Sequence, residues 1–295
     1  MKRKRGRMSH TVEPRKKKTT TQTFIQMKKR GEKISMLTAY DALTAGIMDE
    51  SGVHSILVGD SLGMVVLGYE TTLQVTMDDM LHHCKAVSRG SKNALLVGDL
   101  PFMTYQVGIQ DAVRNSGRML QEAGMHAVKL EGGREREETI KAIVSAGIPV
   151  MGHLGLTPQS VNQFGGFAVQ ANTAAAAKRL LEDALILQES GCFSLVLESI
   201  PARLAEVVTN RLDIPTIGIG AGAGCDGQVL VTPDMIGLFS RFTPRFVRKY
   251  ANFHDDMLDA FSRYILDVQT GGFPGQEQTY EMSDAEWEET LRLLK

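Results

Sequence analysis

The sequence is poor in cysteine, and its few cysteines lie far apart. Cys84, Cys192 and Cys225 are the three in 295 residues, and no C-x-x-C spacing occurs. This pattern gives no basis for a disulfide framework, and it lacks the closely spaced Cys and His ligands of a zinc site. Unpaired thiols suit a reducing compartment, so we expect a cytoplasmic protein.

Long apolar runs are also missing. No run approaches the roughly 20 residues needed to cross a bilayer, and the basic N-terminus is not followed by the apolar segment of a secretory signal. Aromatic residues make up only 6%, whereas 29 glycines and 43% hydrophobic residues are typical of a globular protein with many tight turns. We therefore expect no membrane partner.

The formal net charge of -1 hides a basic N-terminus. Residues 1–20 hold nine Lys or Arg side chains and one acid, Glu13. Because this stretch has no apolar periodicity, we predict a basic, disordered arm over residues 1–22. Nucleic-acid binding through the arm is the non-enzymatic alternative. It contains no aromatic side chain on which bases could stack, so we favour a solvated tail and expect no nucleic-acid partner.

From residue 23 the chain alternates between strand-like and helix-like segments. Strands are predicted over Ile34–Tyr40, His54–Asp60, Ala94–Asp99, Ala127–Glu131, Ile148–His153, Phe193–Ser199 and Ile214–Gly220, with an eighth at Arg245–Tyr250. Helices are predicted over Asp41–Ser51, Met77–Arg89, Gln110–Glu122, Arg134–Ala146, Thr173–Ser190 and Ala202–Asn210. The helix at Met77 has Thr76 and Asp79 placed for a capping box.

This alternation predicts an α/β fold, a (β/α)8 TIM barrel over residues 23–275. The strands are nearly continuous apolar runs, which is typical of a parallel sheet covered on both faces. An open doubly wound sheet is the alternative, but it would gather its site at one switch point rather than all around the chain. We predict a closing amphipathic helix at residues 252–268, and a polar tail at 276–295 with a short helix near Ser283–Leu294.

Polar side chains end five of the predicted strands. In a barrel all strand C-termini meet at one mouth, so these side chains should share one small volume. They are Asp60, Asp99, Lys129, Glu131, His153 and Glu198.

Several carboxylates in one water-poor mouth would repel one another unless a cation neutralised them. Mg²⁺ prefers a few carboxylates together with waters or substrate oxygens, and a 2-oxo acid could bind it through two oxygens. Such binding would stabilise an enolate by roughly several kcal/mol, and a positioned base would add about 10²–10⁴-fold. Lys129 could offset substrate charge, while Ser61 and the amides around Gly63 could hold a carboxylate.

Six segments carry a family resemblance. They read Met36-Leu-Thr-Ala-Tyr-Asp41, Val58-Gly-Asp-Ser-Leu-Gly-Met64, Asp99-Leu-Pro-Phe-Met103, Val128-Lys-Leu-Glu-Gly-Gly133, Gly152-His-Leu-Gly-Leu-Thr-Pro-Gln-Ser160 and Gly218-Ile-Gly-Ala-Gly222. In register over about residues 23–275, they strongly resemble the 3-methyl-2-oxobutanoate hydroxymethyltransferase family. The resemblance implies a barrel of the phosphoenolpyruvate/pyruvate type and a homo-oligomer, a decamer.

The resemblance also implies a reaction. A hydroxymethyl group would pass from 5,10-methylenetetrahydrofolate to 3-methyl-2-oxobutanoate with Mg²⁺, giving 2-dehydropantoate for pantothenate biosynthesis. The family's metal-binding acids fall on Asp60, Asp99 and Glu131. Its substrate contacts fall on Asp60, Ser61, Asp99, Lys129 and His153. Glu198 matches the base that removes the C3 proton.

Some features leave alternatives open. The chain reads Phe164-Gly-Gly-Phe-Ala-Val-Gln-Ala-Asn172 where the family usually carries basic residues, and Pro233 replaces a frequent histidine, which puts folate contacts in doubt. The run Gly218–Gly224 could bind phosphate or serve close backbone packing, and it lacks the Gly-Lys-Ser/Thr ending of a P-loop. The enzymatic alternative is a metal-dependent lyase or mutase of the phosphoenolpyruvate/pyruvate barrel type, which shares the enolate chemistry.

Overall fold

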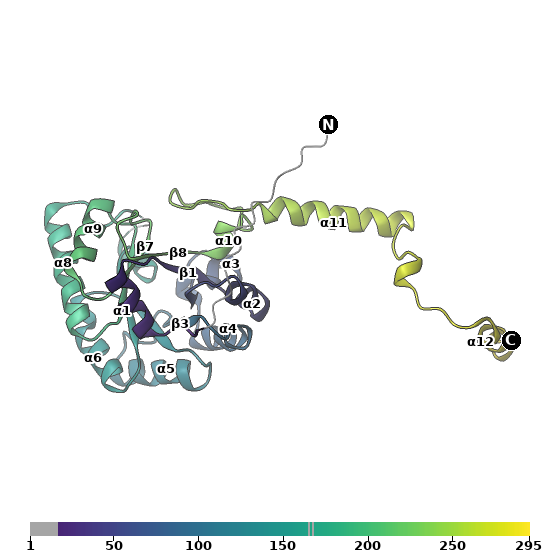
Figure 1. Cartoon of the computed structure of the whole chain (residues 1–295), viewed down its shortest axis with the longest axis horizontal. Coiled ribbons are helices and arrows are strands. Elements are labelled where there is room, and N and C mark those ends of the chain that lie inside the picture. The colour runs from purple at the N-terminus through teal and green to yellow at the C-terminus, as the bar shows by residue number, and fades with distance from the viewer. Residues whose placement is uncertain (1–16, 165, 167) are drawn as a thin grey trace.

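The computed structural model describes residues 17–164, 166 and 168–295 of the chain (Figure 1). Eight parallel strands pair in sequence order, and β8 pairs with β1 to close a barrel. The predicted (β/α)8 TIM barrel is therefore confirmed. The strands are β1 (Ile34–Thr38), β2 (Ser55–Val58), β3 (Leu95–Asp99), β4 (Ala127–Glu131), β5 (Val150–Gly155), β6 (Ser194–Glu198), β7 (Thr216–Ile219) and β8 (Gly227–Leu230).

Six long helices follow the first six strands around the outside. They are α2 (Ala42–Glu50), α4 (Met77–Gly90), α5 (Ile109–Gln121), α6 (Glu137–Ser145), α8 (Ala174–Glu189) and α9 (Ala202–Arg211). The predicted capping box is present at α4, where Thr76 and Asp79 each accept the other's backbone N–H. The predicted helix Arg134–Ala146 divides into a 3₁₀ turn, η2 (Arg134–Arg136), and α6.

Short elements lie in the loops beyond the strand ends. They are α3 (Leu62–Val65) and η1 (Thr72–Gln74) after β2, η3 (Pro158–Ser160) and α7 (Val161–Phe164) after β5, and α10 (Thr232–Met235) after β8. These loops surround the C-terminal mouth of the barrel.

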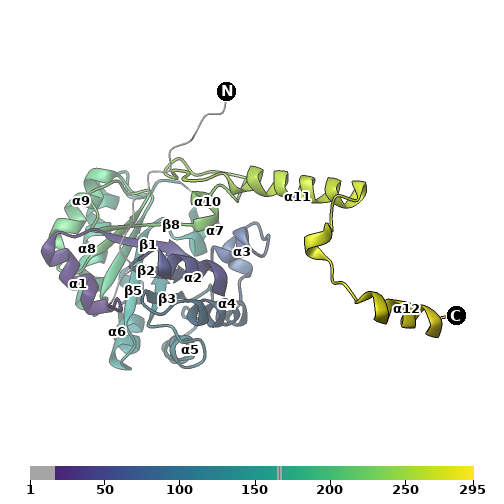
Figure 2. The same ribbon diagram turned by 45° about the vertical axis from the view of Figure 1, so that its right-hand side comes forward.

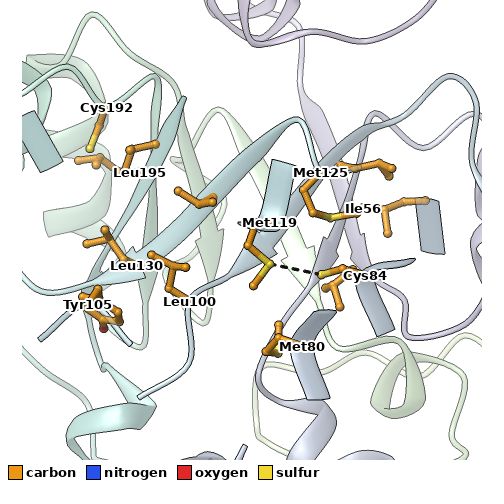
Figure 3. Close-up of a cluster of buried hydrophobic side chains, with 14 of the residues drawn as sticks. Ile56, Met80, Cys84, Leu100, Tyr105, Met119, Met125, Leu130, Cys192 and Leu195 are labelled. Carbon is orange, nitrogen blue, oxygen red and sulfur yellow. Dashed lines mark hydrogen bonds between the residues drawn. The ribbon is translucent and has the colours of Figure 1, made fainter. Parts of the chain in front are cut away.

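Two apolar clusters hold the barrel together. One fills the space between the strands and the outer helices and includes Ile56, Met80 and Leu130 (Figure 3). The other lies inside the barrel and includes Val97 and Met151. Each such side chain contributes roughly 1.5–3 kcal/mol by its burial. The strands are thus covered on both faces, as their continuous apolar runs predicted.

An N-terminal helix that the sequence patterns did not predict covers the other end of the barrel. Helix α1 (Thr21–Arg30) begins within the last two residues of the predicted arm, whose residues 1–16 lie outside the described part. Phe24 is fully buried, and its ring contacts that of Phe193, just before β6, at 5.9 Å between centroids. Lys28 Nζ reaches Asp226, just before β8, at 2.8 Å. The helix therefore lies at the N-terminal ends of the strands.

The prediction of the eighth strand at Arg245–Tyr250 was wrong. The eighth strand is Gly227–Leu230, which pairs with β1 and β7. It is four residues long and begins with glycine, and its two buried residues alternate with one exposed and one half-buried residue. It therefore lacks the continuous apolar run that identified the other strands.

Two C-terminal helices lie away from the barrel (Figure 2). Helix α11 (Phe253–Thr270) forms where it was predicted, but it does not close the barrel, since none of its residues is buried. After α11 the chain passes through a 3₁₀ turn, η4 (Gln276–Gln278), to α12 (Asp284–Leu293), which is the predicted terminal helix. Among the described residues, no helix has the length and apolar character needed to cross a membrane.

Candidate active site

The structure brings all the predicted site residues to one cavity at the C-terminal mouth. The cavity has a volume of about 370 Å³, and its floor and walls include Asp60, Ser61, Asp99, Lys129, Glu131, His153 and Glu198. Asp99 and Glu198 are the last residues of β3 and β6, while Asp60 follows the end of β2. The side chains converge because parallel strands deliver their C-terminal ends to the same face of a barrel.

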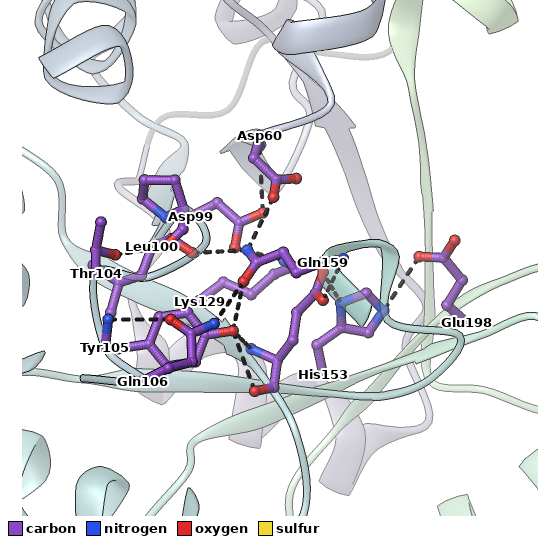
Figure 4. Close-up of polar contacts among 12 residues, drawn as sticks. Asp60, Asp99, Leu100, Thr104, Tyr105, Gln106, Lys129, His153, Gln159 and Glu198 are labelled. Atoms are coloured by element: carbon purple, nitrogen blue, oxygen red, sulfur yellow. Dashed lines mark hydrogen bonds and ion pairs between the residues drawn. The ribbon is translucent and has the colours of Figure 1, made fainter. Parts of the chain in front are cut away.

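The acids at the base of the cavity are buried close together (Figure 4). Asp60 and Glu131 are each 4% exposed, and Asp99 is 1% exposed. Burial, followed by repulsion from Asp99 and Glu131, raises the pKa of Asp60 well above its usual value. Burial likewise raises the pKa of Asp99, although Lys129 opposes that change. The ionised state of these carboxylates is therefore costly without a cation.

Lys129 supplies a positive charge at the base of the cavity. Its Nζ donates to Asp99 Oδ1 at 2.6 Å, and the side chain is buried. Burial by itself would lower the pKa of Lys129, but Asp99, Glu131 and Asp60 together outweigh burial and raise it. Lys129 is therefore a fixed positive charge.

His153 lies between two carboxylates. Its Nδ1 is 3.4 Å from Glu131 Oε1, and its Nε2 is 3.2 Å from Glu198 Oε2. Burial and Lys129 would lower the pKa of His153, but the two carboxylates outweigh them and raise it to about 9. A protonated imidazole therefore links Glu131 to Glu198. Neither ring nitrogen makes an aligned hydrogen bond among the described residues, so these are charge contacts.

Ser61 stands beside Asp60 at the start of α3. Its Oγ lies 2.9 Å from the hydroxyl oxygen of Tyr40, which follows β1. The turn is tightly packed, since a Cβ added at Gly63 would lie 2.6 Å from Val75. The hydroxyl and the turn are therefore held at the cavity wall.

Sequence reasoning missed two buried residues of this network, Gln159 and Tyr105. Gln159 Nε2 donates to Asp60 Oδ2 at 2.9 Å, and its backbone N–H donates to Glu131 Oε2 at 3.0 Å. The Tyr105 hydroxyl donates to Gln159 Oε1 at 2.7 Å. Both residues lie in loops beyond the strand ends, whereas the predictions drew on polar residues at the ends of apolar strands. The position of Gln159 within a family-like segment was the signal that could have found it.

The upper wall of the cavity is apolar and aromatic. It includes Phe239, Phe242 and Phe246, together with Arg245, from the irregular segment after α10. The Phe246 ring packs on Gly220, whose φ is +65° and where an added Cβ would lie 2.8 Å from the ring. This contact favours the close-packing interpretation of the glycine run at residues 218–224.

The donor set fits an ion that takes few protein ligands. Among the described residues, no group of three or more His, Cys, Asp or Glu side chains is arranged to hold a metal ion. That geometry does not suit zinc, which is usually enclosed by three or four protein ligands. Mg²⁺ is usually bound by one or two carboxylates and otherwise by waters or substrate oxygens. The buried, mutually repelling Asp60 and Asp99 fit that requirement.

Curated relatives of high identity share nearly the whole chain. A 3-methyl-2-oxobutanoate hydroxymethyltransferase from Syntrophus aciditrophicus is 62% identical over 264 residues, covering 90% of this chain and 97% of the relative. The enzyme of the same name from Clostridioides difficile is 56% identical over 271 residues, covering 92% and 98%.

Solved structures share the fold at low identity. A phosphonomutase-like protein from Burkholderia cenocepacia matches with a TM-score of 0.58 at 15% identity, covering 85% of this chain and 98% of that one. Phosphonopyruvate hydrolase, in a complex with oxalate and Mg²⁺, matches with a TM-score of 0.57 at 11% identity, covering 94% and 98%. A 2,3-dimethylmalate lyase of the PEP mutase/isocitrate lyase superfamily gives 0.56 at 14%, covering 93% and 97%. These matches show that the chain shares the barrel fold of these proteins.

The family profile described as ketopantoate hydroxymethyltransferase matches residues 18–276. The lyases and mutases share only the fold, whereas the hydroxymethyltransferases share more than half of the aligned residues. The lyase or mutase alternative is therefore set aside. The chain belongs to the ketopantoate hydroxymethyltransferase family, and its activity is the transfer of a hydroxymethyl group to 3-methyl-2-oxobutanoate in pantothenate biosynthesis.

Proposed function

We propose that the transfer depends on Mg²⁺ and takes its one-carbon unit from 5,10-methylenetetrahydrofolate, giving 2-dehydropantoate. The observation that carries the proposal is the excess of buried carboxylates at the base of the cavity, with Glu198 on the other side of His153. The buried acids need a cation, and Glu198 would act as a base from the cavity wall.

Asp60 and Asp99 would hold the ion, and Glu131 would contact it directly or through water. When bound, Mg²⁺ supplies Lewis acidity toward the 2-keto oxygen, which stabilises developing negative charge by roughly several kcal/mol. The complex of phosphonopyruvate hydrolase with oxalate and Mg²⁺ supports this role, because it pairs the same fold with a metal and a dicarboxylate.

The remaining residues orient the 2-oxo acid and move its proton. Ser61 and the amides of the following turn would hold the substrate carboxylate, while Lys129 would offset its charge. Glu198 would remove the C3 proton, and the nucleophilic C3 would then bond to the methylene carbon of the folate. Both bonds from that carbon to the folate nitrogens break, water supplies the hydroxyl oxygen, and tetrahydrofolate leaves with the C3 proton and one proton from water on its nitrogens. His153 Nε2 lies 3.2 Å from Glu198 Oε2, and this contact would hold the Glu198 side chain in place.

The co-substrate would enter above the acids. The aromatic wall of Phe242 and Phe246 offers flat surfaces for the folate ring system, and Arg245 offers a cation for its carboxylates. This wall would replace contacts that the altered loop at 164–172 lacks. Residues 165 and 167 of that loop lie outside the described part.

Proton exchange tests the proposed base without needing folate. Purified protein with Mg²⁺ should exchange the C3 proton of 3-methyl-2-oxobutanoate in D₂O, followed by proton NMR. Glu198→Gln should slow the exchange by about 10²–10⁴-fold, because the base is removed, and EDTA should abolish it. Exchange that continues unchanged in Glu198→Gln would exclude Glu198 as the base.

We further propose a homo-oligomer, a decamer as the family resemblance implies, working in the cytoplasm. Apolar side chains lie along one side of α11, none of whose residues is buried, and Leu43 and Ile47 on α2 are 82% and 70% exposed. A second copy of the chain could cover both surfaces. Three free, buried cysteines support a reducing compartment. The division into a basic arm, a barrel and a polar tail remains part of this proposal.

A further inference from the structure

Gln159 joins two of the proposed metal-binding acids through different parts of one residue. Its side-chain amide donates to Asp60 Oδ2 at 2.9 Å, and its backbone N–H donates to Glu131 Oε2 at 3.0 Å (Figure 4). The residue is 5% exposed, so water does not compete effectively for these bonds. Asp60 and Glu131 come from different strand ends, and Gln159 is hydrogen-bonded to both.

The direction of the Gln159 amide is fixed by its surroundings. Nε2 also donates to the Leu100 carbonyl at 2.9 Å, and both Leu100 O and an ionised Asp60 can only accept. Oε1 in turn accepts from the Tyr105 hydroxyl at 2.7 Å and from Gln106 Nε2 at 3.2 Å. A reversed amide would place oxygen against oxygen, so one N–H must point at Asp60.

Tyr105 extends the same network to β4. Its hydroxyl donates to Gln159 and accepts the backbone N–H of Glu131 at 3.2 Å. Pro158 opens the turn that carries Gln159, and its restricted φ reduces the freedom of that turn. The donors of Gln159 are neutral, unlike Lys129 on Asp99, so they orient carboxylates without cancelling the negative charge that attracts a cation.

We propose that Gln159 is a positioning residue that holds Asp60 and Glu131 in the orientation that binds the divalent cation, and thereby sets metal affinity. The proposal rests on the metal site of the proposed function. Partners that orient metal-binding side chains typically change metal affinity by about 10–100-fold when they are lost.

Direct Mn²⁺ binding tests the proposal on the full chain without any turnover. Electron paramagnetic resonance of free Mn²⁺ gives the dissociation constant for the unaltered protein and for Gln159→Met, which keeps the side-chain length but loses both polar groups. We expect the constant to rise by about 10–100-fold. Gln188→Met is the matched control, because Gln188 Oε1 bridges the backbone N–H groups of Asp213 and Ile214 just before β7, away from the mouth. It should leave Mn²⁺ binding unchanged.

Unchanged Mn²⁺ affinity in a Gln159→Met protein with a native circular dichroism spectrum would overturn the proposal. If that variant does not fold, Tyr105→Phe decides, because it keeps Gln159 but removes the hydroxyl that orients its amide. Weaker Mn²⁺ binding by Tyr105→Phe supports the proposal, and unchanged binding overturns it. Failure of the unaltered protein to bind Mn²⁺ would instead overturn the metal site of the proposed function, and this inference with it.

Discussion

At the scale of single residues, the cavity holds more negative than positive charge. Its acidic side chains are Asp60, Asp99, Glu131, Glu198 and Asp234, and its basic side chains are Lys129, His153 and Arg245. Buried charges destabilise a fold unless they are paired, and the pairing here is incomplete. Such a site is expected to lower the stability of the metal-free protein in return for affinity toward a cation and an anionic substrate.

Asp60→Asn should therefore stabilise the metal-free protein at neutral pH. Burial and the neighbouring acids raise the pKa of Asp60 in the folded state, so the stability contributed by its protonation is fully present only below the unfolded pKa of about 4. That contribution to stability is lost as the pH rises through the folded pKa. We expect the variant to gain about 1 kcal/mol at pH 8, a rise in melting temperature of roughly 2–4 °C, and little at pH 4.

Differential scanning fluorimetry with and without MgCl₂ checks this prediction. Mg²⁺ should raise the melting temperature of the unaltered protein at pH 8 and have much less effect on Asp60→Asn. The same variant should bind the metal and the 2-oxo acid more weakly, because the proposal gives Asp60 both contacts. A lower melting temperature for metal-free Asp60→Asn at pH 8 would contradict the charge argument.

Polar residues at the ends of apolar strands could be predicted as site residues, whereas Gln159 and Tyr105 could not. Asp99, Glu131 and Glu198 could be predicted because each ends an apolar strand, and a barrel fixes where strand ends meet. Gln159 and Tyr105 lie several residues into loops, whose paths depend on tertiary packing. No periodic pattern in the sequence encodes such a path.

At the scale of elements, two helical glycines differ in their surroundings, and helix–helix packing depends only on Gly90 of the two. A Cβ at Gly90, the last residue of α4, would lie 2.2 Å from the Ala42 carbonyl oxygen on α2. Gly90→Ala should therefore destabilise the protein by about 1–3 kcal/mol through overpacking. Gly117 on α5 has no atom within 4 Å of such a Cβ, so Gly117→Ala should stabilise by about 0.5–1 kcal/mol. Urea unfolding of both variants measures the two signs, and equal effects would refute the packing argument.

The sequence patterns did not predict β8 or α1, because both elements depend on contacts with other parts of the chain. Strand β8 is recognisable by its pairing with β1 and β7, because four residues beginning with glycine give no strand signal of their own. Helix α1 was not predicted because the sequence around it is basic, and only two of its residues, Phe24 and Met27, are buried. The other seven strands are longer or more apolar, and they could be predicted from their own apolar runs.

At the scale of the whole molecule, helix α11 forms where the sequence predicted a helix, but it does not pack on the barrel as expected. The amphipathic pattern of α11 predicted an apolar surface but could not specify what covers it. In the single chain the helix lies away from the barrel (Figure 1), and its apolar side chains are exposed. An apolar stripe of this size is typical of an interface with another copy or partner.

Phe261→Asp should therefore disrupt the proposed homo-oligomer. Met257, Phe261 and Ile265 recur at four-residue spacing along one side of α11, and each is at least 40% exposed. A carboxylate at the centre of that stripe would lose roughly 1.5–3 kcal/mol of apolar burial for every copy and add a charge to a dry interface. Size-exclusion chromatography with light scattering should show a smaller assembly. Leu266→Asp on the opposite side of α11 is the control and should leave the mass unchanged. If Phe261→Asp and the unaltered protein have the same mass, the stripe does not hold the copies together.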